Sequence, residues 1–316
     1  MPNQNNEIQH IKLPTELENL LNEYQSHCRK NGLREGSIEL YLKENRWFLQ
    51  AISENGCETA GQISASHVVV ACLALKSNSY LSTIKTFLRF LFSERYTDKD
   101  YSRVVPEYKR PQPIPLVYSE EEIYRMEMAI DRCVPVGKRD YAIILLATRL
   151  GLRLEDIRTM SFDELDFETD AIRLVQEKTL VRLELPMVSE LKTALLDYIR
   201  NGRPNAKGTV FLLSYPPYSP LSKSGIIACF RRALHKAKIE RGERGCGPRA
   251  FRVSLASSMV NDGVPYEVVR KTLGHIDPNA IKSYARLDVE RLRTYALEIP
   301  KASGGFANLL YGRGLL

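Results

Sequence analysis

The chain has 316 residues, of which 44% are hydrophobic and 26% are charged, with a formal net charge of +7. This length is enough for two domains that each bury a core, and the composition is that of an ordinary globular protein. No apolar run approaches the ~18 residues that cross a bilayer. The polar first residues, MPNQNNEIQHIK, do not resemble a secretory signal. We therefore expect a cytoplasmic protein with no membrane partner.

Charge is unevenly distributed along the chain. Acidic and basic residues nearly balance over residues 1–108, so the positive excess lies in residues 109–316. A basic surface favours a polyanionic partner, because neutralising phosphates releases their counterions. A basic surface without such a partner is the alternative, and charge alone leaves both open.

The cysteines and histidines give no sign of a metal site. The six cysteines form no CxxC pair and no repeated spacing, and the five histidines are scattered. Clustered ligands would be needed for zinc. We expect reduced thiols, no metal and no cofactor.

The first part of the chain has a helical period. Apolar residues recur at three- and four-residue spacing over residues 13–106, in segments separated by short polar turns. The pairs Asn31-Gly32 and Asn55-Gly56 end the first two segments. The pattern predicts a bundle of four helices.

From residue 103 onward, a proline-rich stretch is followed by segments in which apolar and polar residues alternate. Residues 103–116 contain four prolines, which favours a semi-rigid spacer between domains. Residues 171–175 and 180–186 alternate between apolar and polar side chains around a turn at 177–179, which predicts a β-hairpin among helices. We therefore predict a mainly α protein with a small antiparallel β-sheet. Its predicted parts are a flexible tail at 1–12, a helical domain at 13–106, a linker at 107–116, a mixed α+β domain at 117–300 and a C-terminal tail at 301–316.

Short motifs follow in a fixed order within residues 117–300. Residues 148–157 read TRLGLRLEDI, and two arginines three residues apart, Arg249 and Arg252, begin an apolar-periodic run. Leu-Gly-His ends at His275, and Tyr284 comes nine residues later. These motifs and their order resemble the tyrosine recombinase (phage integrase) family, in its Xer-like form. The resemblance covers roughly residues 13–298.

The resemblance implies an active site that cuts and rejoins DNA without a metal or cofactor. Arg153 and Arg252 would clamp the phosphate, since guanidinium is always charged and fits two phosphate oxygens. His275 would hydrogen-bond the same phosphate. Tyr284 would be the nucleophile that forms a covalent phosphotyrosine. Lys178, in the hairpin turn, would give a proton to the leaving 5′-hydroxyl.

Three further positions lie within or near these motifs. Asp156 would hold the arginines in position without contacting the DNA itself. Arg249 stands where the family usually has histidine, and arginine can donate a hydrogen bond but cannot accept a proton near neutral pH. Either the site tolerates this donor or it is impaired, and the other matching positions favour tolerance. Arg149 stands where a small or polar residue is more usual.

The resemblance also implies partners and an architecture. The helical domain would be a core-binding domain that closes with the catalytic domain round double-stranded DNA as a C-shaped clamp. The active species would be a homotetramer on two duplexes, nucleoid-associated when bound and working through a Holliday junction, with accessory DNA-bending proteins as further candidate partners. Mobile-element integration, excision and chromosome dimer resolution all use this chemistry. Candidate phosphate contacts are the basic residues Lys76, Lys85, Arg89, Lys109 and Arg110.

Two other functions fit part of the pattern. A type IB topoisomerase or telomere resolvase would use the same chemistry, but the four-helix domain and compact hinge favour a recombinase. A DNA-binding protein could use the same fold without cleavage.

Overall fold

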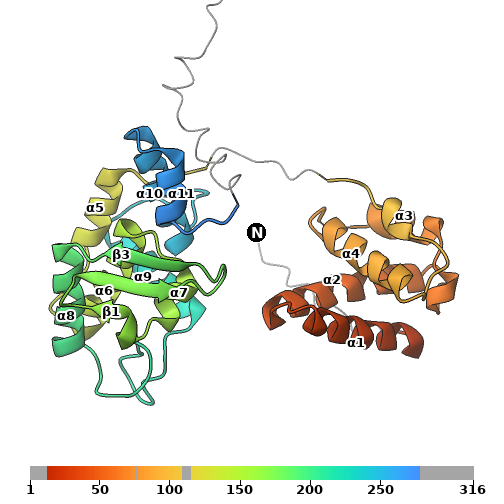
Figure 1. Ribbon diagram of the computed structural model, residues 1–316, viewed down its shortest axis with the longest axis horizontal. Helices are drawn as coiled ribbons and strands as arrows, with labels where there is room; N and C mark the ends of the chain where they lie inside the picture. Colours follow the sequence, from red (N-terminus) through yellow and green to blue (C-terminus); the bar gives the residue numbers. More distant parts are fainter. Residues whose placement is uncertain (1–12, 76, 109–114, 278–316) are drawn as a thin grey trace, which may run out of the picture. The chain divides into compact units, whose positions relative to one another are not determined.

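The computed structural model describes residues 13–75, 77–108 and 115–277. The chain divides into two compact units, residues 1–111 and residues 112–316 (Figure 1). Each unit has its own hydrophobic core. No helix in the described ranges is long and apolar enough to cross a membrane.

Helices are the only regular secondary structure in the described residues of the first unit. Its core is mainly aliphatic but contains a group of aromatic rings: Tyr24 and Phe87 meet edge to face at 5.0 Å, and Phe48 is fully buried near Phe87. Ser64 caps one helix by accepting a hydrogen bond from His67 N. The helices are α1 (Thr15–Lys30), α2 (Glu35–Ser53), α3 (Ala65–Leu73) and α4 (Tyr80–Ser93), with 3-10 turns at Ala60–Gln62 and Tyr101–Arg103.

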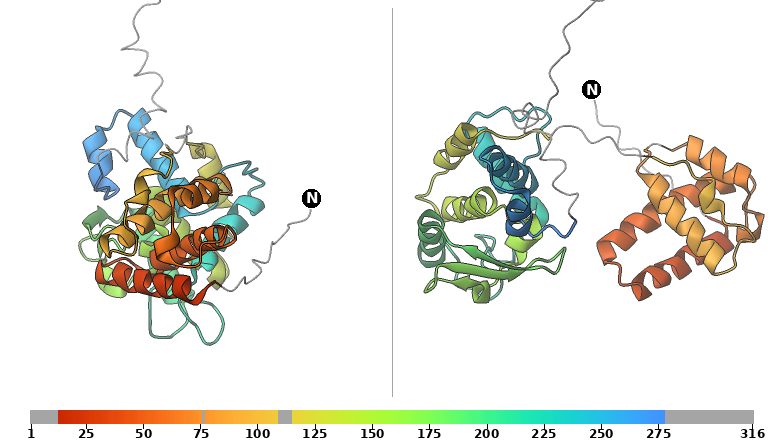
Figure 2. Two further views of the ribbon diagram at one scale, coloured as in Figure 1. Left: turned by 90° about the vertical axis from the view of Figure 1, so that its right-hand side faces the viewer. Right: turned by 45° about the horizontal axis from the view of Figure 1, so that its top comes forward.

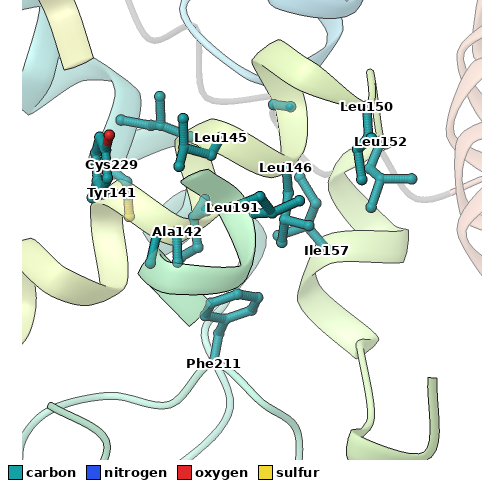
Figure 3. Close-up of a cluster of buried hydrophobic side chains, with 14 of the residues drawn as sticks. Tyr141, Ala142, Leu145, Leu146, Leu150, Leu152, Ile157, Leu191, Phe211 and Cys229 are labelled. Atoms are coloured by element: carbon teal, nitrogen blue, oxygen red, sulfur yellow. The ribbon is translucent and has the colours of Figure 1, made fainter. Parts of the chain in front are cut away.

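Helix α6 (Pro135–Arg149) is the centre of the second unit. Residues 141–148 are all buried, as expected of a helix that is apolar on every side. Figure 3 shows its leucines among side chains from neighbouring elements, including Leu191 and Phe211. The other described helices of this unit are α5 (Glu120–Met128), α7 (Leu154–Thr159), α8 (Ser189–Asn201), α9 (Lys223–Lys236), α10 (Pro248–Asn261) and α11 (Tyr266–Thr272).

A small antiparallel sheet accompanies these helices. In the described part of the unit, β1 (Leu165–Asp166), β2 (Ala171–Val175) and β3 (Arg182–Pro186) pair in that order, side by side in Figure 2. Leu174 lies opposite Leu183, and the apolar residues of this face join the core around α6. The prediction of a mainly α protein with a small antiparallel sheet is confirmed.

The hairpin turn is one detail in which the structure differs from the sequence prediction. The second strand begins at Arg182 and not at Leu180. Leu180 has a left-handed φ of 55°, and its N–H donates to the carbonyl of Gln176 at 2.8 Å, which closes the turn. Strand β1 was not predicted, because two residues are too few for an alternation to be visible.

Candidate functional site

Two arginines from different elements converge on one loop. Arg153 precedes α7, and its Nη2 donates to the carbonyl of Gly274 at 3.2 Å. Arg252, in α10, is only 5% exposed, and its Nη2 donates to the carbonyl of Leu273. Helices α10 and α11 lie side by side (Figure 1), so the loop after α11 passes these arginines. Consecutive carbonyls of this loop therefore each accept a hydrogen bond from one arginine.

A second contact holds Arg252 against the chain segment that carries Arg153. Its Nη1 donates to the carbonyl of Gly151 at 2.7 Å. Gly151 has a left-handed φ of 60°, a conformation that residues with a side chain rarely adopt. The turn after α6 thus presents its carbonyl to Arg252 and leads directly into Arg153.

His275 follows the two carbonyls. Its N–H donates to the carbonyl of Arg270 at 3.0 Å, and Arg270 Nη1 donates back to the carbonyl of His275 at 2.9 Å. Burial lowers the pKa of His275 to about 4, and the positive charges of Arg252, Arg153 and Arg270 act in the same direction. The imidazole is therefore neutral at neutral pH.

Asp156 connects this cluster to the hairpin turn. It lies in the first turn of α7, is 4% exposed, and accepts a hydrogen bond from the backbone N–H of Glu177 at 2.9 Å. Burial raises its pKa, although the Glu177 N–H and the nearby Arg153 oppose that shift. Lys178, the next residue of the turn, is exposed. The turn that carries Lys178 is thus fastened to the helix that follows Arg153.

The remaining predicted residues lie elsewhere or outside the described chain. Arg249 is exposed in the first turn of α10, one turn before Arg252. In the first unit, Lys85 lies 3.9 Å from Glu107 in an ion pair, and Arg89 is exposed. Outside the described residues are Lys76, Lys109, Arg110 and Tyr284. Within the described ranges, no cluster of His, Cys, Asp and Glu is arranged to hold a metal ion.

Sequence reasoning gave no role to Arg149 and missed Gln176. Arg149 forms ion pairs with Glu127 and Glu190. Gln176 is fully buried at the base of the hairpin turn and donates to the carbonyl of Leu273. The strand alternation contained the signal for Gln176, since it continues the inward-facing series of Ile172 and Leu174.

Comparison with known proteins gives consistent matches. A family model described as the phage integrase family matches residues 117–291. Two proteins of Sinorhizobium fredii (strain NBRC 101917 / NGR234) are described only provisionally as integrase/recombinases. One, y4rA, is 29% identical over 91% of this chain and 72% of its own length. The other, y4gC, is 32% identical over 59% of this chain and 97% of its own length.

Solved structures show the same fold. A lambda integrase dimer bound to a COC′ core site aligns with a TM-score of 0.65, over 84% of this chain and 94% of that one. The sequences are 14% identical in this alignment, so the likeness is one of fold.

Proposed function

This chain belongs to the phage integrase family, the tyrosine recombinases, and on that premise we propose that it is a site-specific DNA recombinase. The observation that carries the proposal is the pair Arg153 and Arg252. Their guanidinium groups are held on consecutive carbonyls beside a neutral His275. Bonds to fixed carbonyls orient a guanidinium before substrate binds, and such preorganised donors stabilise the charge that develops on a reacting phosphate.

The proposed reaction is a transesterification at a DNA phosphodiester. The phenolic oxygen of Tyr284 attacks phosphorus and loses its proton to solvent, which a cationic site makes easier for a group of ordinary pKa about 10. A phosphorus–oxygen bond to tyrosine forms as the bond to the 5′-oxygen breaks. Lys178 gives its proton to that oxygen, and a 3′-phosphotyrosine and a free 5′-hydroxyl result. Attack by a 5′-hydroxyl in the reverse direction rejoins the strand.

The proposal extends to the partner and the assembly. The partner is double-stranded DNA, in keeping with the DNA-bound lambda integrase whose fold this chain resembles. We propose that the active species is a homotetramer in the cytoplasm, in which each subunit closes round DNA as a clamp. The tetramer would hold two duplexes and exchange their strands through a Holliday junction. The helical unit would supply the core-binding surface, with Lys85 and Arg89 among its phosphate contacts.

Trapping on a nicked suicide substrate tests the nucleophile. Tyr284→Phe should bind target DNA with near-normal affinity but form no covalent complex that survives SDS, because it lacks the attacking oxygen. Tyr295→Phe is the matched control and should still form the complex. A persistent adduct in Tyr284→Phe would assign the nucleophile elsewhere, with Tyr295 as the next candidate. Relaxation of supercoiled DNA without a target site would indicate a topoisomerase instead.

A further inference from the structure

The turn that carries Lys178 is organised round one buried amide. The backbone of Gln176 closes the turn: its N–H donates to Val181 at 2.9 Å, and its carbonyl accepts from Leu180 at 2.8 Å. Its side chain, with no exposed surface, accepts a hydrogen bond from Thr179 Oγ1 at 2.7 Å. One residue thus fixes the turn through both its backbone and its side chain.

The same side chain ties the turn to the loop that ends in His275. Gln176 Nε2 donates to the carbonyl of Leu273 at 3.2 Å. That carbonyl also accepts the hydrogen bond from Arg252. Beside it, Gly274 has a φ of 61°, and a β-carbon there would lie 2.5 Å from Gln176 Oε1. The amide therefore packs directly against the backbone of Leu273 and Gly274, just before His275.

Only an amide of this length satisfies both neighbours. Its oxygen accepts from the Thr179 hydroxyl, and its nitrogen donates to the Leu273 carbonyl. A glutamate would keep an acceptor for Thr179 but offer no donor to the carbonyl, and an apolar side chain would offer neither. The chemistry of the contact thus selects glutamine at this position.

We propose that Gln176 is a positioning residue for the proton-transfer step. It holds the Lys178 turn against the loop of Leu273–His275, so that the ammonium group reaches the leaving oxygen while Arg252 and His275 hold the phosphate. Asp156 gives the turn a second attachment by accepting a hydrogen bond from Glu177 N–H. Without the Gln176 side chain the turn keeps its attachment to Asp156 but is no longer fixed relative to the loop of Leu273–His275. A small displacement of the acid is enough to slow proton transfer. This inference rests on the proposed function.

The test compares leaving groups. Gln176→Met should form the covalent complex about 10–100-fold more slowly on an ordinary suicide substrate, a smaller loss than the ~10²–10⁴-fold expected for Lys178→Ala. On a substrate whose 5′ bridging oxygen is replaced by sulfur, both variants should come within about threefold of the wild type, because a thiolate leaves without a proton. Glu168→Gln is the control: it removes a carboxylate at an exposed position in the turn between β1 and β2, away from the Lys178 turn, and should match the wild type on both substrates.

The possible outcomes separate this role from a structural one. Equal losses on the oxygen and sulfur substrates would assign Gln176 to general stability or phosphate binding and overturn the inference, as would no loss at all. If Gln176→Met does not fold, Thr179→Val decides, since it removes one of the two side-chain bonds. It should show a smaller loss with the same rescue by sulfur. A wild type that forms no adduct on either substrate would overturn the proposed function, and this inference with it.

Discussion

His275 is surrounded by positive charge before any DNA is bound. Its pKa falls to about 4 because of burial and the neighbouring Arg252, Arg153 and Arg270. A neutral imidazole can donate a hydrogen bond from one nitrogen and accept one at the other. A bound phosphate would offset the arginines, so substrate binding should raise the pKa of His275 towards its ordinary value.

This pKa makes the stability of the free protein depend on pH. In the unfolded chain His275 takes up a proton near pH ~6.5, whereas in the folded chain it does so only near pH 4. Between these values the unfolded state binds more protons, so the free energy of unfolding should decrease as the pH falls. Urea unfolding of wild type and His275→Gln at neutral pH and at a pH of about 5 should show a larger decrease for the wild type. Carboxylates present in both proteins cancel in this comparison, and equal decreases would contradict the prediction.

Arg249 is the one departure from the family pattern among the predicted catalytic residues. It is exposed in α10, one turn before the buried Arg252. If it acts only as a hydrogen-bond donor to the phosphate, Arg249→His should retain or raise the rate of covalent complex formation, since histidine also donates. Arg249→Ala, which has no donor, should lose activity. A large loss in Arg249→His would show that the site depends on the charge or reach of arginine.

At the scale of elements, Arg149 fastens three helices together. It ends α6, and its guanidinium forms two hydrogen bonds, of 2.8 and 2.7 Å, with Glu127 of α5. A second carboxylate, Glu190 of α8, lies 3.2 Å away and also accepts from Tyr141. Glu127 is 1% exposed and receives a further hydrogen bond from Thr148. The residue that fits the family motif least well is thus explained by packing.

Removing Arg149 should leave a buried carboxylate without its counter-ion. Arg149→Met should lower the free energy of unfolding by about 2–3 kcal/mol, less than the 3–5 kcal/mol of a fully buried pair, because the Arg149 side chain is 32% exposed. Adding Glu127→Gln should recover most of this loss, since the charge is then gone. Urea unfolding followed by circular dichroism measures both variants. A single variant as stable as the wild type would contradict the prediction.

The elements also show how far sequence reasoning reaches. The burial of α6 and the β2–β3 hairpin could both be predicted from the spacing of apolar residues. A helix buried on every side has a continuous apolar run, whereas a strand buried on one face alternates between apolar and polar residues. The sequence predicts a helix from Lys138 to Arg149, whereas α6 begins at Pro135, because proline is tolerated in the first turn of a helix. The order of the motifs identified Arg153 and Arg252 as candidate site residues. No sequence pattern shows that they donate hydrogen bonds to consecutive carbonyls. That pairing, like the contact of Gln176 with Leu273, joins residues far apart in sequence and exists only after folding.

At the scale of the whole molecule, the C-terminal segment is the part with no assigned role. It lies outside the described residues, so its sequence is the guide. Ser303-Gly304-Gly305 predicts a hinge, and an apolar group follows: Phe306, Leu309, Leu310 and Tyr311. Exposed apolar side chains are unfavourable in water, so these residues should dock on a surface. Cyclic head-to-tail exchange between subunits would bury them and close a ring, whereas folding back onto the same domain is the alternative.

Deletion after Lys301 distinguishes these arrangements. If the segment is exchanged, the shortened chain should bind a single target site almost normally but fail to assemble complexes that hold two sites. Sedimentation of the protein with paired target duplexes measures this assembly. Equal assembly with and without the segment would contradict exchange between subunits.

The two separate cores have a practical consequence for every variant above. The only tryptophan of the chain, Trp47, lies in α2 and meets the ring of Tyr80 at 6.2 Å, within the first unit. The candidate catalytic residues and the Arg149 ion pairs belong to the second unit. Tryptophan fluorescence therefore reports on a unit that these substitutions do not touch. A backbone or tyrosine signal, which also reports on the second unit, should therefore be used to tell an unfolded variant from a folded but inactive one.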